Sequence, residues 1–398
     1  MMVTEDKLKE LAGRYGTPLY VFDKDEVRAR AEEIRRIMNE GNGAGEISLC
    51  YSIKANPFLI PLLKDVVDRF EVCSPGELTI CEHYKVEPEM IIYSGVHKET
   101  EDITEALRYG AWLITAESRR HYDMICRVAE ETGEETEVIL RLASGSQFGM
   151  SGEDIEGILA DSDRHPGVKI AGLHYFVGTQ RMKLKHQRAE LDKLQTVFSE
   201  LRERYGIPLE KLEYGPGLGF PYFEGEDFSD TLSPAKELAA DLIKAAGWSS
   251  LTVEMGRFLA SSCGTYLTSV VDIKQSEGRN WCIVDGGINH VNYLGQMMGL
   301  KVPVIKELRG KSREGTDMAW GLCGSLCTTN DVLVREYRTG ELMVGDVLAF
   351  CNSGAYSVTE AMNLFLSRDM PRIVVTGSDG DMLVRDTVKT WKLNSGSV

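Results

Sequence analysis

The stretch Leu49-Cys50-Tyr51-Ser52-Ile53-Lys54-Ala55-Asn56-Pro57 decides the fold of this chain. Apolar and small residues run into a lysine, which predicts a short buried strand, because buried parallel strands are near-continuous apolar runs. Pro57 cannot donate to a sheet ladder and ends the run. Burying the charged amine of a lysine at the end of such a strand costs free energy, which favours a functional role for that amine. Burial favours the neutral amine, a nucleophile that forms Schiff bases; the alternative is a lysine that snorkels to solvent.

Further apolar runs follow at similar intervals, and amphipathic stretches such as 190–205 separate them. Eight strand–helix units over roughly 200–250 residues are typical of a (β/α)8 barrel. The sequence therefore predicts an α/β fold built on a TIM-like barrel, and a doubly wound sheet is the alternative. The expected strands are Leu49–Lys54, Phe70–Ser74, Ile91–Gly95, Trp112–Ala116, Val138–Leu142, Ile170–Phe176, Leu212–Gly215 and Leu251–Glu254.

Beyond Glu254 the pattern changes to short strand-like runs between Gly, Asn and charged turns. Such runs predict a separate C-terminal β domain. The early strand Leu19–Phe22 has no place in the barrel and is expected to complete that domain. We therefore predict a barrel domain at 23–260 and a β domain made of 1–22 and 261–398. The short runs are Val270–Ile273, Trp281–Val284, Asp331–Leu333 and Asp346–Cys351.

Charge and cysteine usage exclude several function classes. The net charge of −16, without a Lys/Arg block, argues against a nucleic-acid partner. The nine cysteines form no CxxC pair, which predicts reduced thiols in a cytoplasm and no zinc or other metal site. No apolar run approaches the roughly 18 residues of a membrane span, so no membrane partner is expected.

The C-terminal ends of the barrel strands should carry the active site. They supply Lys54, a Gly-rich loop at 215–219, and Glu254 with Arg257. The loop and Glu254 follow strands seven and eight, where barrels often bind phosphate, although a Gly-rich turn alone is also typical of an ordinary turn. Combined with a strand-end lysine, the pattern indicates pyridoxal 5'-phosphate (PLP). The other strand ends supply Ser74, Arg141, His174 and Phe176.

Motifs along nearly the whole chain resemble those of the fold type III (alanine racemase-like) PLP-dependent decarboxylases. That family includes the diaminopimelate, ornithine and arginine decarboxylases. Tyr51-Ser-Ile-Lys54-Ala-Asn56 resembles the cofactor-lysine motif of the family. The other matching segments, in the same order as in the family, are 70–78, 172–180, 215–219, 254–257, 327–331 and 354–356.

The resemblance implies roles for the matching residues. Lys54 would carry the cofactor covalently, and Glu254 would pair with the pyridine nitrogen, because a carboxylate keeps that nitrogen protonated. Cys327 would donate a proton to the substrate carbon from the partner subunit of a homodimer with shared active sites; a lone cysteine is otherwise usually a core residue. The implied cofactor-binding residues are Lys54, Phe176, Thr179, Gly217, Gly219, Glu254, Gly256, Arg257 and Tyr356. The candidate substrate-binding residues are Arg141, Thr328, Asp331 and Tyr356.

Several positions depart from the family pattern. Phe176 stands where a histidine usually stacks on the cofactor ring, Pro216 replaces a glycine of the phosphate loop, and Glu71 replaces the usual Asp. Thr328 stands where the family has the acidic residue that binds the distal amine of a diamino acid. The Arg-Pro-x-Leu-Tyr segment typical of diaminopimelate decarboxylases is absent. The residues around the substrate therefore differ, while those around the cofactor are kept.

The segments 219–223 and 352–356 resemble the butirosin-pathway decarboxylase, which acts on carrier-protein-bound glutamate. We therefore predict a specialised biosynthetic enzyme that removes the α-carboxylate of an amino acid as CO2. Its substrate, free or linked to a carrier protein, would not be diaminopimelate. Three alternatives stay open: a diaminopimelate decarboxylase of lysine biosynthesis, a racemase or epimerase on the same fold, and a non-catalytic homologue.

Overall fold

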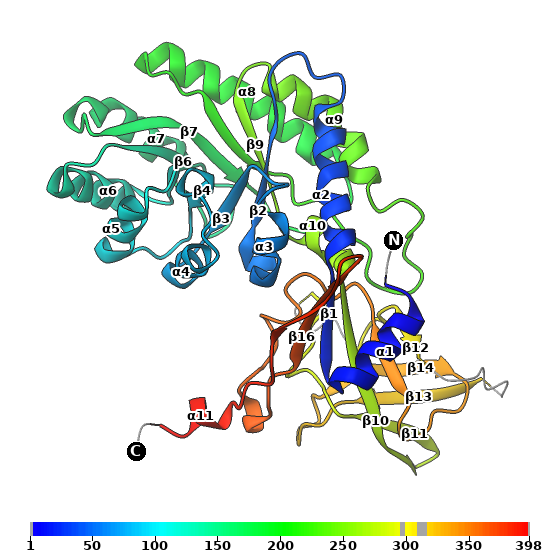
Figure 1. Cartoon of the computed structure of the whole chain (residues 1–398). Helices are drawn as coiled ribbons and strands as arrows, with labels where there is room; N and C mark the ends of the chain where they lie inside the picture. The colour runs from blue at the N-terminus through cyan, green and yellow to red at the C-terminus, as the bar shows by residue number, and fades with distance from the viewer. Residues whose placement is uncertain (1–2, 295–298, 309–316, 397–398) are drawn as a thin grey trace. The chain divides into compact units, whose positions relative to one another are not determined.

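Eight parallel strands close into a barrel, which confirms the predicted fold class (Figure 1). The computed structural model describes residues 3–294, 299–308 and 317–396. Each barrel strand pairs in parallel with the next, and the last pairs with the first, so that Tyr51 lies opposite both Phe70 and Met255. The strands are β2 (Ser48–Ser52), β3 (Arg69–Val72), β4 (Ile91–Tyr93), β5 (Leu113–Ala116), β6 (Thr136–Arg141), β7 (Val168–Phe176), β8 (Lys211–Gly215) and β9 (Ser250–Met255).

Helices connect the barrel strands and lie on the outside of the barrel (Figure 1). Local sequence sets several of their starts. The hydroxyls of Ser74, Ser118 and Ser151 each accept a hydrogen bond from the backbone N–H three residues later, which is ordinary N-capping. The helices are α2 (Lys24–Asn39), α3 (Ile60–Leu63), α4 (Pro75–His83), α5 (Thr100–Tyr109), α6 (Arg119–Thr132), α7 (Gly152–Asp161), α8 (Lys185–Tyr205), α9 (Ser233–Ala246) and α10 (Arg257–Ala260).

Small and apolar side chains from different barrel strands pack together in one buried cluster. All of them are at most 2% exposed. A packed interior of this kind is typical of (β/α)8 barrels and leaves the chemistry to the C-terminal strand ends. The members of the cluster are Cys50, Ile92, Leu113, Ile139 and Ala171.

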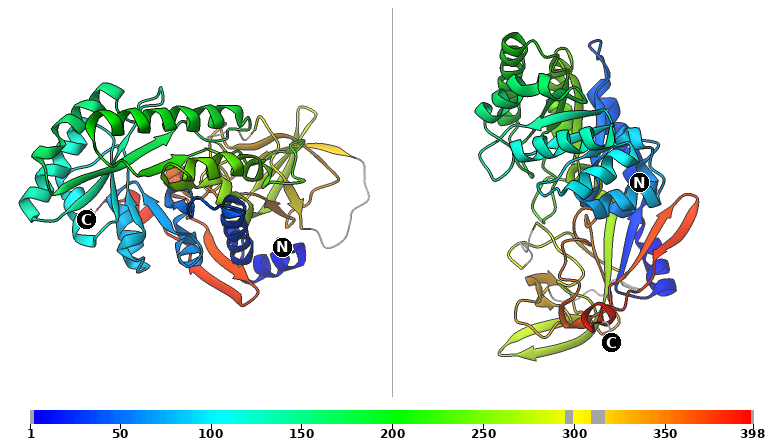
Figure 2. Two further views of the ribbon diagram at one scale, coloured as in Figure 1. Left: turned by 90° about the horizontal axis from the view of Figure 1, so that it is seen from above. Right: turned by 90° about the vertical axis from the view of Figure 1, so that its left-hand side faces the viewer.

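The remaining strands form a separate nine-stranded mixed sheet. Its strand β1 (Leu19–Asp23) runs antiparallel to β10 and parallel to β16, so the segment expected to complete the β domain does belong to this sheet. The strands β16 and β17 form an antiparallel hairpin, orange-red in Figure 2. The other strands are β10 (Gly264–Ser276), β11 (Arg279–Val284), β12 (Ile305–Glu307), β13 (Met318–Cys323), β14 (Val332–Thr339), β15 (Val347–Phe350), β16 (Arg372–Gly377) and β17 (Gly380–Arg385).

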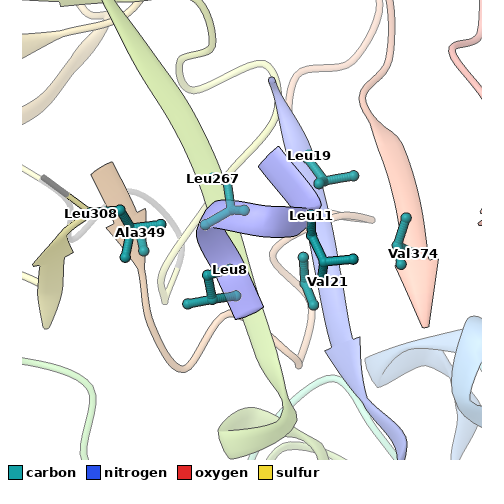
Figure 3. Close-up of a cluster of buried hydrophobic side chains, with 8 residues drawn as sticks. All are labelled: Leu8, Leu11, Leu19, Val21, Leu267, Leu308, Ala349 and Val374. Atoms are coloured by element: carbon teal, nitrogen blue, oxygen red, sulfur yellow. The ribbon is translucent and has the colours of Figure 1, made fainter. Parts of the chain in front are cut away.

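The core of this second sheet is covered by a helix that the sequence analysis did not predict, α1 (Glu5–Tyr15). Leu8 and Leu11 of α1 point toward apolar side chains of the sheet (Figure 3). Burying each leucine contributes about 2 kcal/mol to stability. The side chains they join are Leu19 and Val21 of β1, Leu267 of β10, Leu308, Ala349 of β15 and Val374 of β16.

The chain divides into two compact units. The barrel unit contains Arg30–Phe220 and Asp230–Leu259, and the sheet unit contains the residues up to Ala29, Pro221–Ser229 and the residues from Ala260 on. Within the described part of the chain, no helix combines the length and the apolar character needed to cross a bilayer.

Candidate active site

Lys54 lies immediately after β2, in a single 3-10 turn, Ile53–Ala55, and not in the strand itself. Asn56 ends this turn, and its side chain accepts a hydrogen bond from the backbone N–H of Phe58. The hydroxyl of Tyr51 donates to the carbonyl of Asn56. The Asn-Pro sequence therefore turns the chain just beyond the strand and leaves the lysine at the C-terminal end of the barrel.

The amine of Lys54 is held by two side chains of the neighbouring segment 71–73. Its Nζ donates to Glu71 Oε2 at 2.7 Å and lies 3.5 Å from Cys73 Sγ. The Cys73 thiol in turn donates to Glu71 Oε1 at 3.2 Å. Burial alone would raise the pKa of Glu71, but the charge and the hydrogen bond of Lys54 outweigh it and hold that pKa well below its usual range. Burial raises the pKa of the Cys73 thiol.

His174, at the end of β7, and Glu254, at the end of β9, meet inside the barrel. Their nearest atoms, Nε2 and Oε2, are 3.3 Å apart. Gly215 makes room for this arrangement, because a Cβ at that position would lie 2.4 Å from both Glu254 Oε1 and the Phe176 ring. Gly215 therefore allows Glu254 and Phe176 both to lie against its backbone, a role that the phosphate-loop interpretation did not foresee.

The loops that follow β7 and β8 are tied together by backbone and amide hydrogen bonds. Gly217 has a φ of +60°, and its carbonyl accepts a hydrogen bond from the N–H of Arg181 at 2.9 Å. A Cβ on Gly217 would lie 1.7 Å from the carbonyl oxygen of Gly178, so only glycine fits there. The Gln180 side chain both donates to and accepts from the backbone of Phe220.

Arg257, the first residue of α10, links the segment that follows β9 to the loops that follow β7 and β8. Its Nε donates to Thr179 Oγ1 at 3.3 Å. Gly256 lies directly before it, and Gly219 lies beside Met182 of the β7 loop. The predicted cofactor-binding residues Thr179, Gly217 and Arg257 thus come together at one edge of the barrel.

Arg141, predicted to bind substrate, is already engaged inside the barrel unit. It ends β6, forms a buried ion pair with Glu117, and its guanidinium lies over the Phe148 ring at 4.7 Å. The same guanidinium is 6.0 Å from the ring centre of Phe176. The second oxygen of Glu117 accepts the N–H of Gly149 at 3.1 Å. A contact between Arg141 and a substrate stays a prediction.

The remaining predicted site residues belong to the sheet unit. Cys327 is exposed and Thr328 is partly exposed, both in the loop that follows β13. Asp331 closes this loop: its carboxylate accepts hydrogen bonds from the N–H groups of Ile288 at 2.9 Å and Leu326 at 2.7 Å. Asp331 is therefore a structural residue of the loop, and its contact with substrate stays a prediction.

Tyr356 follows β15 and adopts a φ of +65°. Positive φ costs energy for a bulky side chain and is enriched at functional sites. The carbonyl of Tyr356 accepts hydrogen bonds from the N–H groups of Thr359 at 3.0 Å and Glu360 at 2.8 Å, which hold the strained turn.

The barrel residues fit PLP. Lys54 supplies an amine, Phe176 an aromatic face, and the loops of Gly217 and Arg257 supply backbone N–H groups and a cation suited to phosphate. Glu254 has a buried oxygen, Oε2, without a hydrogen-bond partner among the described residues, as expected of a carboxylate that pairs with a ring N–H. The sequence analysis did not identify Glu213 or Glu117 as members of this site.

The chain is similar to known decarboxylases over nearly its full length. The family model for the pyridoxal binding domain of pyridoxal-dependent decarboxylases matches residues 24–261. A diaminopimelate decarboxylase of Zymomonas mobilis is 26% identical, covering 97% of this chain and 93% of the relative. An L-glutamyl-[BtrI acyl-carrier protein] decarboxylase of Niallia circulans is 27% identical, covering 97% and 94%.

A solved structure supports the same assignment. The diaminopimelate decarboxylase of Methanocaldococcus jannaschii superimposes with a TM-score of 0.88 at 26% identity, covering 98% of this chain and 94% of that one. The predicted barrel, β domain and cofactor are thereby confirmed. This chain belongs to the pyridoxal-dependent decarboxylases of fold type III and is a PLP-dependent amino-acid decarboxylase.

Proposed function

We propose that this enzyme removes the α-carboxylate of an amino acid whose far end is neutral, acidic or linked to a carrier protein, and not an ammonium. The observation that carries the proposal is the loop 324–331. Asp331 is the one acidic residue of this loop, and each of its carboxylate oxygens accepts a hydrogen bond from a backbone N–H group. The family's acidic contact for a distal amine is replaced in this loop by Thr328.

The chemistry of recognition favours such a substrate. A hydroxyl binds an ammonium far more weakly than a carboxylate does, because hydrogen bonds to charged groups are about twice as strong as neutral ones. Losing one buried contact of that kind costs about 2–5 kcal/mol in discrimination. The 27% identity to a decarboxylase of carrier-bound glutamate supports the same class of substrate.

The residues of the site have different roles in the proposed reaction. Bound PLP supplies an electron sink for the electron pair that remains when CO2 leaves. Lys54 anchors the cofactor, the Gly217 and Arg257 loops hold its phosphate, and Glu254 keeps its ring nitrogen protonated. Phe176 would cover one face of the ring, since an aromatic side chain can stack without titrating. Cys327, from a partner subunit, would supply the proton that the substrate carbon takes up after CO2 leaves.

The proposal includes a homodimer with shared active sites. Cys327 and Tyr356 belong to the sheet unit, whereas Lys54 and Glu254 belong to the barrel unit. The domain boundaries 23–260 and 261–398 stay part of this proposal. We also propose a reducing compartment such as the cytoplasm, because all nine cysteines are free.

A CO2-release screen tests the proposal. The PLP-loaded enzyme is supplied with meso-diaminopimelate, lysine, ornithine, free glutamate and glutamate linked to a carrier protein, all carboxyl-labelled. Faster release from glutamate or carrier-linked glutamate than from any diamino acid supports the proposal. A diamino acid as the best substrate contradicts it. Retention of the label with inversion at the α-carbon would indicate a racemase instead.

A second candidate is diaminopimelate decarboxylase. Relatives with that activity, such as the enzyme of Zymomonas mobilis, match this chain over nearly the full length of both proteins. This candidate requires another acidic residue to bind the distal amine. The same screen separates it from the first, because it predicts rapid CO2 release from meso-diaminopimelate.

A further inference from the structure

Glu213, on β8, is a buried carboxylate that the proposed roles do not use. It is 1% exposed and points into the barrel, where it is paired in register with His174 of β7. Neither of its carboxylate oxygens has a hydrogen-bond partner among the described residues. Buried polar groups are almost always hydrogen-bonded, and buried charges are almost always paired. An ionised, unpartnered Glu213 is therefore not a stable arrangement.

The acidic neighbours of Glu213 make its ionisation still less favourable. A ring nitrogen of His174 and one carboxylate oxygen each of Glu213 and Glu254 lie within 4.8 Å of one another. The nearby cations are engaged elsewhere, since Lys54 pairs with Glu71, and Arg141 pairs with a glutamate of its own. The titratable and charged groups that face Glu213 are Cys50, Lys54, Glu71, Arg141, His174 and Glu254.

Burial and the neighbouring carboxylates raise the pKa of Glu213, and together they outweigh the opposing charges of Lys54 and Arg141. Burial, followed by the negative charges of Glu254 and Glu71, raises the pKa of Glu213 well above its usual range. Two carboxylates in one buried site cannot both ionise without a large penalty, so one of them keeps a proton. Glu254 ends its strand beside His174, whereas Glu213 has no partner at all among the described residues. The proton therefore belongs on Glu213.

We propose that Glu213 is a positioning residue, a neutral carboxylic acid whose O–H donates to the carboxylate of Glu254. Both side chains have a buried carboxylate oxygen that makes no hydrogen bond among the described residues, and a small side-chain rotation would bring Glu213 and Glu254 into contact. The O–H of Glu213 would then hold the carboxylate of Glu254 in orientation for the cofactor's ring nitrogen. This inference rests on the family's cofactor and not on the identity of the substrate, so it can fail independently of the function proposed above.

Infrared spectroscopy of the PLP-loaded enzyme tests the protonation state directly. A protonated carboxylic acid has a C=O stretching band that ionised carboxylates lack, and the band shifts in D2O. We expect such a band at pH 7 in the wild type and its loss in Glu213→Gln. The exposed Glu101→Gln serves as the matched control and should keep the band. Absence of the band in the wild type, or its persistence in Glu213→Gln, would overturn the proposal.

Two substitutions separate hydrogen bonding from simple packing. Glu213→Gln keeps a neutral donor and should leave the dissociation constant of PLP within about threefold of the wild type. Glu213→Leu removes the donor and should raise that constant about tenfold, which corresponds to one lost hydrogen bond. Equal PLP affinity of the two variants would overturn the proposal. If the leucine variant does not fold, the infrared band and the glutamine variant still decide the question.

Discussion

The amine of Lys54 donates a 2.7 Å hydrogen bond to the carboxylate of Glu71, a side chain only 3% exposed. The family resemblance places Asp at this position, and the extra methylene of Glu lengthens the reach of the carboxylate. The pair holds Lys54 at the barrel end, with the thiol of Cys73 donating to the other oxygen of Glu71. The lysine is therefore positioned by its own neighbours in the barrel.

Replacing Glu71 with Gln should destabilise the cofactor-free protein by about 1–2 kcal/mol at pH 7, because one partner of a charged hydrogen bond is lost. The pKa of Glu71 is lower in the folded protein than its unfolded value of about 4.3. The Lys54–Glu71 pair therefore contributes its full stabilisation of the folded state above about pH 4.3. The difference should shrink as the pH falls through the folded pKa. Urea unfolding of the two proteins between pH 7 and pH 3 measures it. A difference that grows toward acid would contradict the assigned pair.

Replacing Lys54 with Ala should abolish the visible absorbance of the bound cofactor and all turnover. Lys98 is the informative comparison, because it is also buried in the barrel unit and its pKa is lowered by burial to about 8. Lys98→Met should keep the absorbance. Borohydride reduction followed by peptide mapping checks both variants, and cofactor attached to Lys98 in the wild type would show that the wrong lysine was assigned.

Mixing two inactive variants should restore activity if the sites are shared between subunits. Lys54→Ala and Cys327→Ala each remove one expected catalytic group, one from each unit of the chain. A mixed dimer would contain one intact site, so up to about a quarter of wild-type activity is expected after random exchange. Subunit exchange is verified with differently tagged chains. No recovery in verified mixed dimers would refute a site built from two subunits.

Restoring an acidic residue at position 328 should improve the use of diamino acids. Thr328→Asp is expected to raise kcat/KM for meso-diaminopimelate about tenfold or more, because a charged hydrogen bond replaces a neutral one. Thr328→Asn is the matched control, since it has nearly the shape of Asp without the charge. Equal kinetics of the two variants would show that position 328 does not contact the distal amine.

The barrel could be predicted because each of its strands is a distinct apolar run in the sequence. The position of Lys54 and of the strand-end loops could be predicted for the same reason, since parallel strands bring their C-terminal ends to one edge. Helix α1 was missed because its Leu8 and Leu11 face partners such as Leu267, which lie far away in sequence. No local pattern reveals that contact.

The electrostatic arrangement of the site could not be predicted from local sequence. Glu213 stands between Leu212 and Tyr214 and reads as an ordinary polar residue of a strand, whereas its surroundings come from β7 and β9. Asp331 is a candidate substrate-binding residue because it lies in a segment, 327–331, that resembles the family. One of the backbone N–H groups that donate to the Asp331 carboxylate belongs to Ile288, 43 residues earlier.

The most direct measurement of the substrate proposal is kcat/KM of the wild-type enzyme for meso-diaminopimelate, compared with carrier-linked and free glutamate under the same conditions. The missing acidic contact at Thr328 and the engaged carboxylate of Asp331 predict poor turnover of diaminopimelate, well below that of the best glutamate substrate. A kcat/KM for meso-diaminopimelate of about 10⁴ M⁻¹s⁻¹ or above, the order of an ordinary working enzyme, would contradict it.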